Sequence, residues 1–338
     1  MSLHESVRQF CSEIGKDPLL VQGAGGNVSW KENDVLWIKA SGTWLADAGD
    51  KDIFVPVKLD HLTKALESCD YGVVPQTFES APLKPSIETL LHALMPHRIV
   101  VHVHAIEVLA HLVRKDFELI NYPTLDKALN ARTVKYCKPG AELAEAVANQ
   151  LDGTSNTRVV FLKNHGVIIG GDSIDEISET LEYLTRFFAT PAVSAQVTTP
   201  DLSLRLADGV EFKPIGVTKL HEVAVTSSLV DRLHDNWALY PDHIVFLGPH
   251  PRLFGSLEEA KSSLEMESEL PDVIFVHGVG TFARETMNKA KIAQLICYYD
   301  VMTKLNDGAP LSTLTDAQIC ELVDWDAEQY RRGVNDTK

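Results

Sequence analysis

The stretch Lys84–His111, KPSIETLLHALMPHRIVVHVHAIEVLAH, decides the fold because it places a carboxylate and two alternating histidines within apolar sequence. Residues 99–104 form a largely β-branched run that is typical of a buried strand. Side chains alternate between the two faces of a strand, so His102 and His104 are expected on the same face. Two imidazoles that point to one place can supply two nitrogen ligands to a zinc ion.

Candidates for the remaining ligands lie on either side of this strand. Upstream, Ser86 is a suitable N-cap for a helix, and Glu88 then falls in the first helical turn, where the helix dipole favours a carboxylate. Downstream, a predicted strand over 158–163 ends in Asn164-His165-Gly166, a turn that can present its histidine at the sheet edge. We therefore hypothesise a metal site with one carboxylate and three histidines: Glu88, His102, His104 and His165.

The alternative interpretation is that these histidines are hydrogen-bonded core residues. This is the more common role of a single histidine in an apolar strand. Other histidines of the same region, namely His92, His97 and His111, are expected to have that role or to lie on the surface.

Composition and charge restrict the class of protein. The 338 residues carry a formal net charge of -16, whereas nucleic acids and anionic membranes require a basic surface, so both are excluded as partners. The five cysteines are widely spaced without a Cys-x-x-Cys pair, as is typical of reduced cytosolic thiols. The sequence has no signal-peptide pattern and no apolar run near the roughly 20 residues of a membrane span. We therefore expect a soluble cytoplasmic protein.

Two loops of small residues flank the predicted strand Val35–Lys39. Residues 23–29, GAGGNVS, precede it, and Ala40-Ser41-Gly42-Thr43 follows it. The first loop does not match G-x-G-x-x-G and leads into a strand, which argues against a dinucleotide site. Free backbone amides of two such loops can hold an oxyanion, although two ordinary turns are the simpler explanation.

A proline-rich stretch over 190–214 predicts a connection between two units, 1–214 and 215–338. Beyond it, strands are expected over Asp242–Leu247 and Val273–His277, followed by a long helix over 284–305. His277-Gly278 resembles His165-Gly166, but no second H-x-H accompanies it. We therefore expect the second unit to be a smaller α/β unit without a metal.

The order of five motifs resembles the class II aldolase/adducin family, typified by fuculose-phosphate and rhamnulose-phosphate aldolases. The resemblance covers about residues 5–190. The second unit is similar to the extended aldolase modules that some bacteria fuse to a short-chain dehydrogenase. The five motifs are Gly25-Gly26-Asn27-Val28-Ser29, Ala40-Ser41-Gly42, Pro85-Ser86-Ile87-Glu88-Thr89, His102-Val103-His104 and Asn164-His165-Gly166.

This resemblance implies a three-layer αβα fold with a mainly antiparallel central sheet, in a homo-oligomer that is a tetramer or a dimer. It makes His102, His104 and His165 the ligands of one zinc ion per chain. Glu88 becomes the catalytic acid/base that can also touch the metal. Asn27, Ser41, Gly42 and Ser86 fall on the family's phosphate-binding positions. Such a site suits zinc-dependent retro-aldol cleavage of a ketose phosphate or a related sugar derivative, and the expected small-molecule partner is a sugar phosphate or a sugar acid.

Two departures from the family pattern leave the substrate open. Ser86-Ile87-Glu88 stands where many aldolases have Ser-Ser-Glu, and the spacing from Glu88 to His102 is shorter than in fuculose-phosphate aldolase. Relatives also include decarboxylases, a dehydratase and an epimerase, and the epimerase tends to carry Asp in place of Glu88. A non-catalytic, adducin-like binding protein is the alternative of a different class, and metal content separates it from a lyase.

Overall fold

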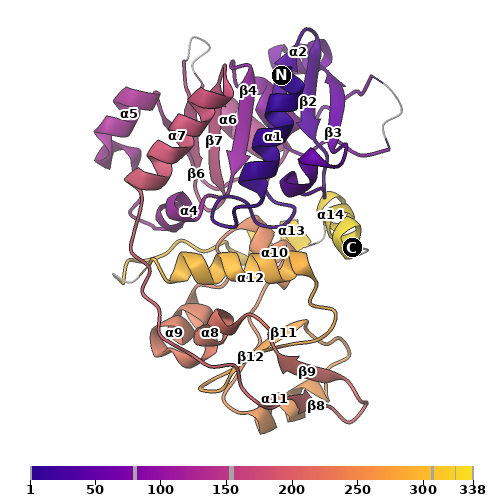
Figure 1. Ribbon diagram of the computed structural model, residues 1–338, viewed down its shortest axis with the longest axis vertical. Coiled ribbons are helices and arrows are strands. Elements are labelled where there is room, and N and C mark those ends of the chain that lie inside the picture. The colour runs from indigo at the N-terminus through magenta and orange to yellow at the C-terminus, as the bar shows by residue number, and fades with distance from the viewer. Residues whose placement is uncertain (1, 79–81, 152–155, 306–307, 324, 337–338) are drawn as a thin grey trace.

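The computed structural model describes residues 2–78, 82–151, 156–305, 308–323 and 325–336. Two β-sheets lie at opposite ends of the molecule, and a horizontal helix, α12 (Lys289–Met302), crosses between them (Figure 1). The N-terminal half of the chain forms the end with the larger sheet. The chain then descends through a long connection to the smaller sheet (Figure 1).

The larger sheet has seven strands in the order β3-β2-β1-β4-β7-β6-β5. Every neighbouring pair is antiparallel except β5 and β6, which confirms the predicted mainly antiparallel sheet. The strands are β1 (Asn27–Glu32), β2 (Val35–Lys39), β3 (Phe54–Lys58), β4 (Ile99–Val103), β5 (Arg132–Val134), β6 (Val159–Leu162) and β7 (Gly166–Gly171).

Helices cover both faces of this sheet. Alternate residues of β4 therefore belong to two different hydrophobic clusters, one on each face. Val101 packs with one set of helices and Val100 with the other. The first set is α1 (Leu3–Gly15), α4 (Ile106–Leu112), α5 (Pro123–Leu129) and α7 (Ile174–Phe187). The second set is α2 (Leu59–Glu67), α3 (Thr89–Leu94) and α6 (Ala141–Ala148). The predicted three-layer αβα architecture is therefore confirmed.

The smaller sheet has the strand order β10-β11-β12-β9-β8. Its strands are β8 (Leu204–Arg205), β9 (Glu211–Pro214), β10 (Leu253–Phe254), β11 (Val273–Val276) and β12 (Gly280–Ala283). The helices of this half are α8 (Glu222–Val225), α9 (Ser227–Asp235), α10 (Pro241–Leu247), α11 (Leu257–Leu264), α12, α13 (Asp316–Val323) and α14 (Asp326–Asp336). The predicted C-terminal α/β unit is present.

The two halves share a hydrophobic core. Ile106 and Leu109 of α4 pack in one cluster with residues of the C-terminal half, including Leu295 and Tyr298 of α12. The predicted division at Pro214 stays a prediction. Strands β8 and β9 precede that division in the sequence but belong to the smaller sheet. Helix α4 belongs to the N-terminal half, but one of its faces packs against the C-terminal half.

Three local predictions were wrong. Asp242–Leu247 is helical rather than a strand; a short apolar run fits either state, and Pro241 at the first helical turn favours the helix. The helix after Ser86 begins only at Thr89, so Glu88 rather than Ser86 occupies the N-cap position. The long C-terminal helix starts at Lys289, because the Asn288 side chain caps it by accepting a hydrogen bond from the Lys291 amide.

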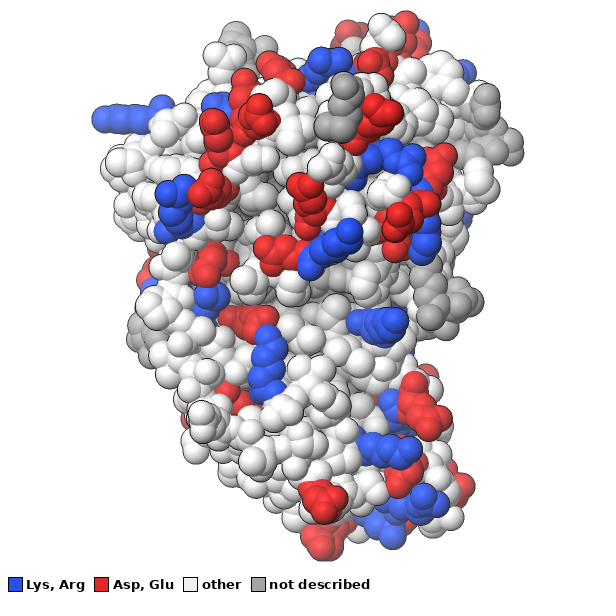
Figure 2. All heavy atoms as spheres, in the orientation of Figure 1, with Lys and Arg blue, Asp and Glu red and all other residues white. Residues whose placement is uncertain are grey.

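The surface carries charges of both signs. On the face in Figure 2, acidic and basic side chains are interspersed, and several acidic groups gather over the larger sheet's end of the molecule. Among the residues that the structure describes, no helix is both long enough and apolar enough to cross a membrane.

Candidate metal centre

Three histidines converge where the strands β4, β6 and β7 of the larger sheet end or begin. His102 lies on β4, His104 follows directly after its end, and His165 lies in the turn between β6 and β7. Register brings these segments together, because β4 pairs with β7 from Ile99–Gly171 to Val103–Val167. Gly166 makes the close approach feasible: a Cβ there would lie 2.6 Å from the Val103 carbonyl oxygen and 2.9 Å from the His104 ring.

The geometry of this triad suits a small metal ion. One ligand atom from each of His102, His104 and His165 lies within 4.8 Å of the others, and all three residues are buried. The Nε2 atoms of His102 and His104 are 3.1 Å apart. Nitrogens bound to a tetrahedral zinc at 2.0 to 2.1 Å are roughly 3.3 Å apart, so the observed spacing is close to that of a ligand pair.

The protonation of these rings also suits metal binding. His102 Nδ1 lies 3.1 Å from the Val167 carbonyl oxygen, to which it can donate only as N–H, and this leaves Nε2 with a free lone pair. Burial lowers the pKa of His104 to about 3 and that of His165 to about 4. Neutral imidazoles are the form that binds a metal.

The Glu88 side chain, at the N-cap of α3, lies beside the histidine triad. Its Oε2 is 3.8 Å from His102 Nε2, and its Oε1 is 3.6 Å from His165 Nε2. The Asn27 side-chain amide donates to Oε2 at 2.7 Å. Burial opposes ionisation, but His102, His165 and the Asn27 hydrogen bond together lower the pKa of Glu88 to about 2. Within the described residues, the buried Oε1 has no hydrogen-bond partner, so this oxygen is a further candidate metal ligand.

The structure also brings together the four residues predicted to hold phosphate. Asn27, Ser41, Gly42 and Ser86 line one cavity of about 30 Å³ together with Glu88, His104 and His165. The Asn27 amide lies 3.4 Å from Ser86 Oγ, and Ser86 Oγ accepts a hydrogen bond from the Glu88 backbone at 3.2 Å. Anion-binding and metal-binding candidates therefore share a single site.

The C-terminal helix α14 covers this cavity. Val334 lies directly over Gly42, whose φ is +76°, and the Asn335 side chain donates to the Gly42 carbonyl at 3.3 Å. Asn335 also accepts a hydrogen bond from Trp44. Helix α14 therefore packs against the small-residue loop around Gly42, which is far from it in the sequence.

Sequence reasoning missed four charged residues of the cavity: Lys39, Asp242, Glu328 and Arg331. Lys39 is buried at the end of β2 and donates to the carbonyls of Ala24 and Thr43; burial lowers its pKa to about 7. A charged residue that ends the apolar run Val35–Lys39, directly before a small-residue loop, was a usable signal. The other three come from α10 and α14 and carried no local signal.

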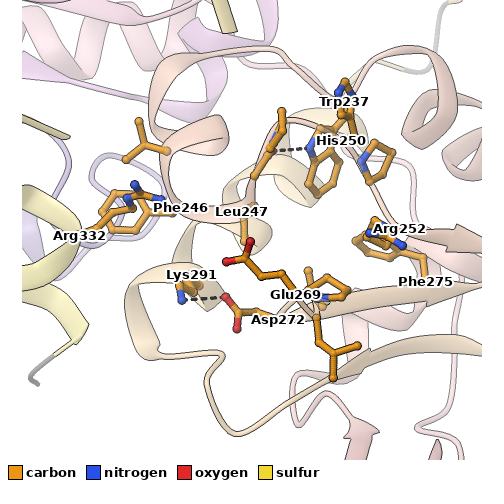
Figure 3. A pocket seen from close by; sticks show the side chains of 17 residues that line it. Trp237, Phe246, Leu247, His250, Arg252, Glu269, Asp272, Phe275, Lys291 and Arg332 are labelled. Atoms are coloured by element: carbon orange, nitrogen blue, oxygen red, sulfur yellow. Dashed lines mark hydrogen bonds and ion pairs between the residues drawn. The ribbon is translucent and has the colours of Figure 1, made fainter. Parts of the chain in front are cut away.

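A larger cavity of about 430 Å³ lies in the C-terminal half, and the three histidines are not among its lining residues. Figure 3 shows the side chains that line it. Two of its basic side chains already have acidic partners. Lys291 pairs with Asp272 at 2.8 Å, and Arg252 pairs with Glu267. The small cavity around the histidines is therefore the better candidate for chemistry.

Comparisons with known proteins identify relatives that match about half of this chain. L-fuculose phosphate aldolase of Methanococcus vannielii is 29% identical over 50% of this chain and 87% of its own length. Uncharacterized oxidoreductase YuxG of Bacillus subtilis is 27% identical over 47% of this chain, but the match spans only 25% of that protein. Among solved structures, the N-terminal class II aldolase domain of a conserved Thermoplasma acidophilum protein is 28% identical, with a TM-score of 0.46, over 55% of this chain and 92% of that chain.

A family model, the class II aldolase and adducin N-terminal domain, matches residues 5–190, which is more than half of the chain. The matched region contains all five motifs and the whole histidine triad. The chain therefore belongs to the class II aldolase and adducin family.

Proposed function

We propose that the protein is a cytoplasmic, homo-oligomeric, zinc-dependent aldolase that cleaves a ketose phosphate or a related sugar derivative. The observation that carries this proposal is the buried triad of His102, His104 and His165 with the Glu88 carboxylate beside it. Three imidazoles favour zinc over magnesium or calcium, which prefer oxygen ligands. The names of the archaeal relatives support an aldolase, and their identity of less than 30% leaves the sugar open.

The residues of the site fit one bound metal ion. A zinc ion held by the triad would act as a Lewis acid and polarise the substrate carbonyl. Glu88 would move the proton, since retro-aldol cleavage removes a proton from the hydroxyl that becomes the aldehyde and adds one to the other fragment. The Asn27 amide holds the Glu88 carboxylate beside the triad, where it would exchange that proton with the substrate.

The cavity also fits an anionic group. Ser41, Gly42 and Ser86 line the same cavity as the buried Lys39. A cavity of about 30 Å³ holds about one water molecule, which is far less than a sugar phosphate occupies. Substrate would therefore enter only when α14 moves away from the loop around Gly42.

Two measurements test the proposal. The purified protein should carry about one zinc ion per chain, measured by elemental analysis. A set of ketose phosphates and sugar acids should then be assayed for release of an aldehyde that depends on this metal. A chain without bound metal would instead favour the adducin-like binding protein. Metal-dependent release of carbon dioxide or water would favour a decarboxylase or a dehydratase.

Inorganic phosphate should compete with substrate, and Ser86→Ala should weaken that competition. A charge-assisted hydrogen bond contributes about 1.5 to 3 kcal/mol, so the inhibition constant should rise at least roughly tenfold. The measurement is the inhibition constant for phosphate in each variant at saturating metal.

Ser86 also has a structural contact, because its hydroxyl accepts from the Glu88 amide. Ser173→Ala is a matched control: Ser173 caps α7 by accepting from the Glu176 amide at 3.2 Å and is not among the residues lining the cavity. Each substitution should cost about 1 kcal/mol of stability, but only Ser86→Ala should alter phosphate inhibition. If inhibition by phosphate were unchanged in Ser86→Ala, Ser86 would have only a structural role.

A further inference from the structure

We propose that Asp242, on α10 of the C-terminal half, is a positioning residue that fixes the tautomer and orientation of His104 for metal binding. The inference rests on the metal site of the proposed function. It gives the C-terminal half a direct part in the active site, through a carboxylate outside the region that the family model matches.

Contact geometry places Asp242 on the opposite side of the His104 ring from His102. Its Oδ2 lies 3.6 Å from His104 Nδ1, whereas His104 Nε2 faces His102. Both side chains are buried, at 6% and 5% exposed. Gly25 leaves the space for this contact: a Cβ there would lie 2.8 Å from Asp242 Oδ2 and 3.1 Å from His104 Nδ1.

The position of the ring protons follows from these neighbours. The Val167 carbonyl requires the proton of His102 on Nδ1, so His102 Nε2 is a lone pair. If the proton of His104 were on Nε2, it could be donated to His102 Nε2. The unprotonated Nδ1 of His104 would then face the buried Asp242 carboxylate, which is unfavourable because both carry lone pairs. The Asp242 carboxylate instead favours the proton on Nδ1. Two Nε2 lone pairs then face each other at 3.1 Å, an arrangement that a cation between them stabilises.

Asp242 is itself held in place by the C-terminal half. Arg331 of α14 donates to both of its carboxylate oxygens, with an Nη2–Oδ2 distance of 2.8 Å, and Gln294 of α12 donates to Oδ2 at 3.4 Å. A guanidinium that donates to both oxygens of a buried carboxylate favours its ionised form. A fixed, ionised carboxylate behind a ligand histidine raises the basicity of that ligand and restricts its rotation.

The test is the affinity for Zn²⁺, measured on the full chain by competition with a chromophoric chelator. Loss of a carboxylate that orients a metal-bound histidine costs 10- to 100-fold in metal affinity, so Asp242→Asn should raise the dissociation constant by about that factor. The visible spectrum of the Co²⁺-loaded protein should also change, because it reports the arrangement of the ligands around the ion.

Asp272→Asn provides the matched control. Asp272 also lies in the C-terminal half, and its side-chain carboxylate has two basic partners, Lys291 and Arg284. It lines the cavity of about 430 Å³ rather than the histidine site. This variant should lose stability while its zinc affinity and Co²⁺ spectrum stay those of the wild type. If Asp242→Asn behaved in the same way, Asp242 would be only a structural ion pair and the inference would be overturned.

Arg331→Lys is a second test of the same inference, to be used if the Asp242→Asn variant does not fold. It retains the charge but loses the two-point hold on Asp242, so a smaller weakening of zinc affinity and an altered Co²⁺ spectrum are expected. Wild-type affinity and spectrum in a folded Arg331→Lys would then overturn the inference. A wild-type protein that binds no zinc would overturn the proposed function itself, which is a different result.

Discussion

Glu88→Gln should retain the fold and the metal but lower turnover by about 10²- to 10⁴-fold, the usual contribution of a positioned acid or base. Glutamine keeps the shape of the side chain and can still accept the hydrogen bond from Asn27. It cannot take up a proton at neutral pH, so the proton transfer of the bond-cleaving step would be lost. The measurement is turnover on an identified substrate, with metal content and melting temperature recorded for the same sample.

Glu222→Gln is a suitable control for this experiment. Glu222 is also a buried carboxylate, and it accepts hydrogen bonds at 2.7 Å from Tyr299 and from the Ala195 amide, but it does not line the histidine cavity. This variant should lose stability without losing turnover per folded, metal-loaded chain. Near-native turnover in a zinc-loaded Glu88→Gln protein would remove Glu88 from the mechanism. Loss of metal together with activity would show that Glu88 is needed as a ligand.

His102→Ala and His104→Ala should each lose the metal and, with it, all metal-dependent activity. Each substitution removes one of the three imidazole ligands, and the two imidazoles that remain do not hold zinc tightly. The double variant should contain no zinc above background after dialysis. Metal content by elemental analysis is the direct measurement, and full occupancy in the double variant would contradict the site.

His221→Ala separates ligand loss from the general cost of removing a buried histidine. The His221 ring is fully buried, and its two nitrogens lie 3.1 Å from the Ile215 carbonyl and the Thr281 amide, outside the metal centre. Its replacement should lower the melting temperature and leave the zinc content unchanged. A similar loss of zinc in all of these variants would indicate unfolding rather than removal of a ligand.

Local patterns were sufficient to predict the central part of the fold. The β-branched run over 99–104 forms the middle strand of the larger sheet, and its period of two places His102 and His104 together. The predicted turn at His165 brings the third ring to the same place. These predictions succeeded because strand alternation and turn composition are properties of neighbouring residues. The roles of the residues in metal binding and catalysis remain predictions.

Tertiary structure alone decided what surrounds the histidines. Residues 242–247 have an apolar run that fits a strand or a helix, and packing against α12 and α13 buries the helix that they form. Asp242, Arg331 and Val334 reach the site from segments far along the chain. The sequence by itself determined the histidine-bearing sheet, because its signals are local. The closure of the cavity and the carboxylate behind His104 were decided by the tertiary structure, because they depend on contacts between distant segments that no local pattern encodes.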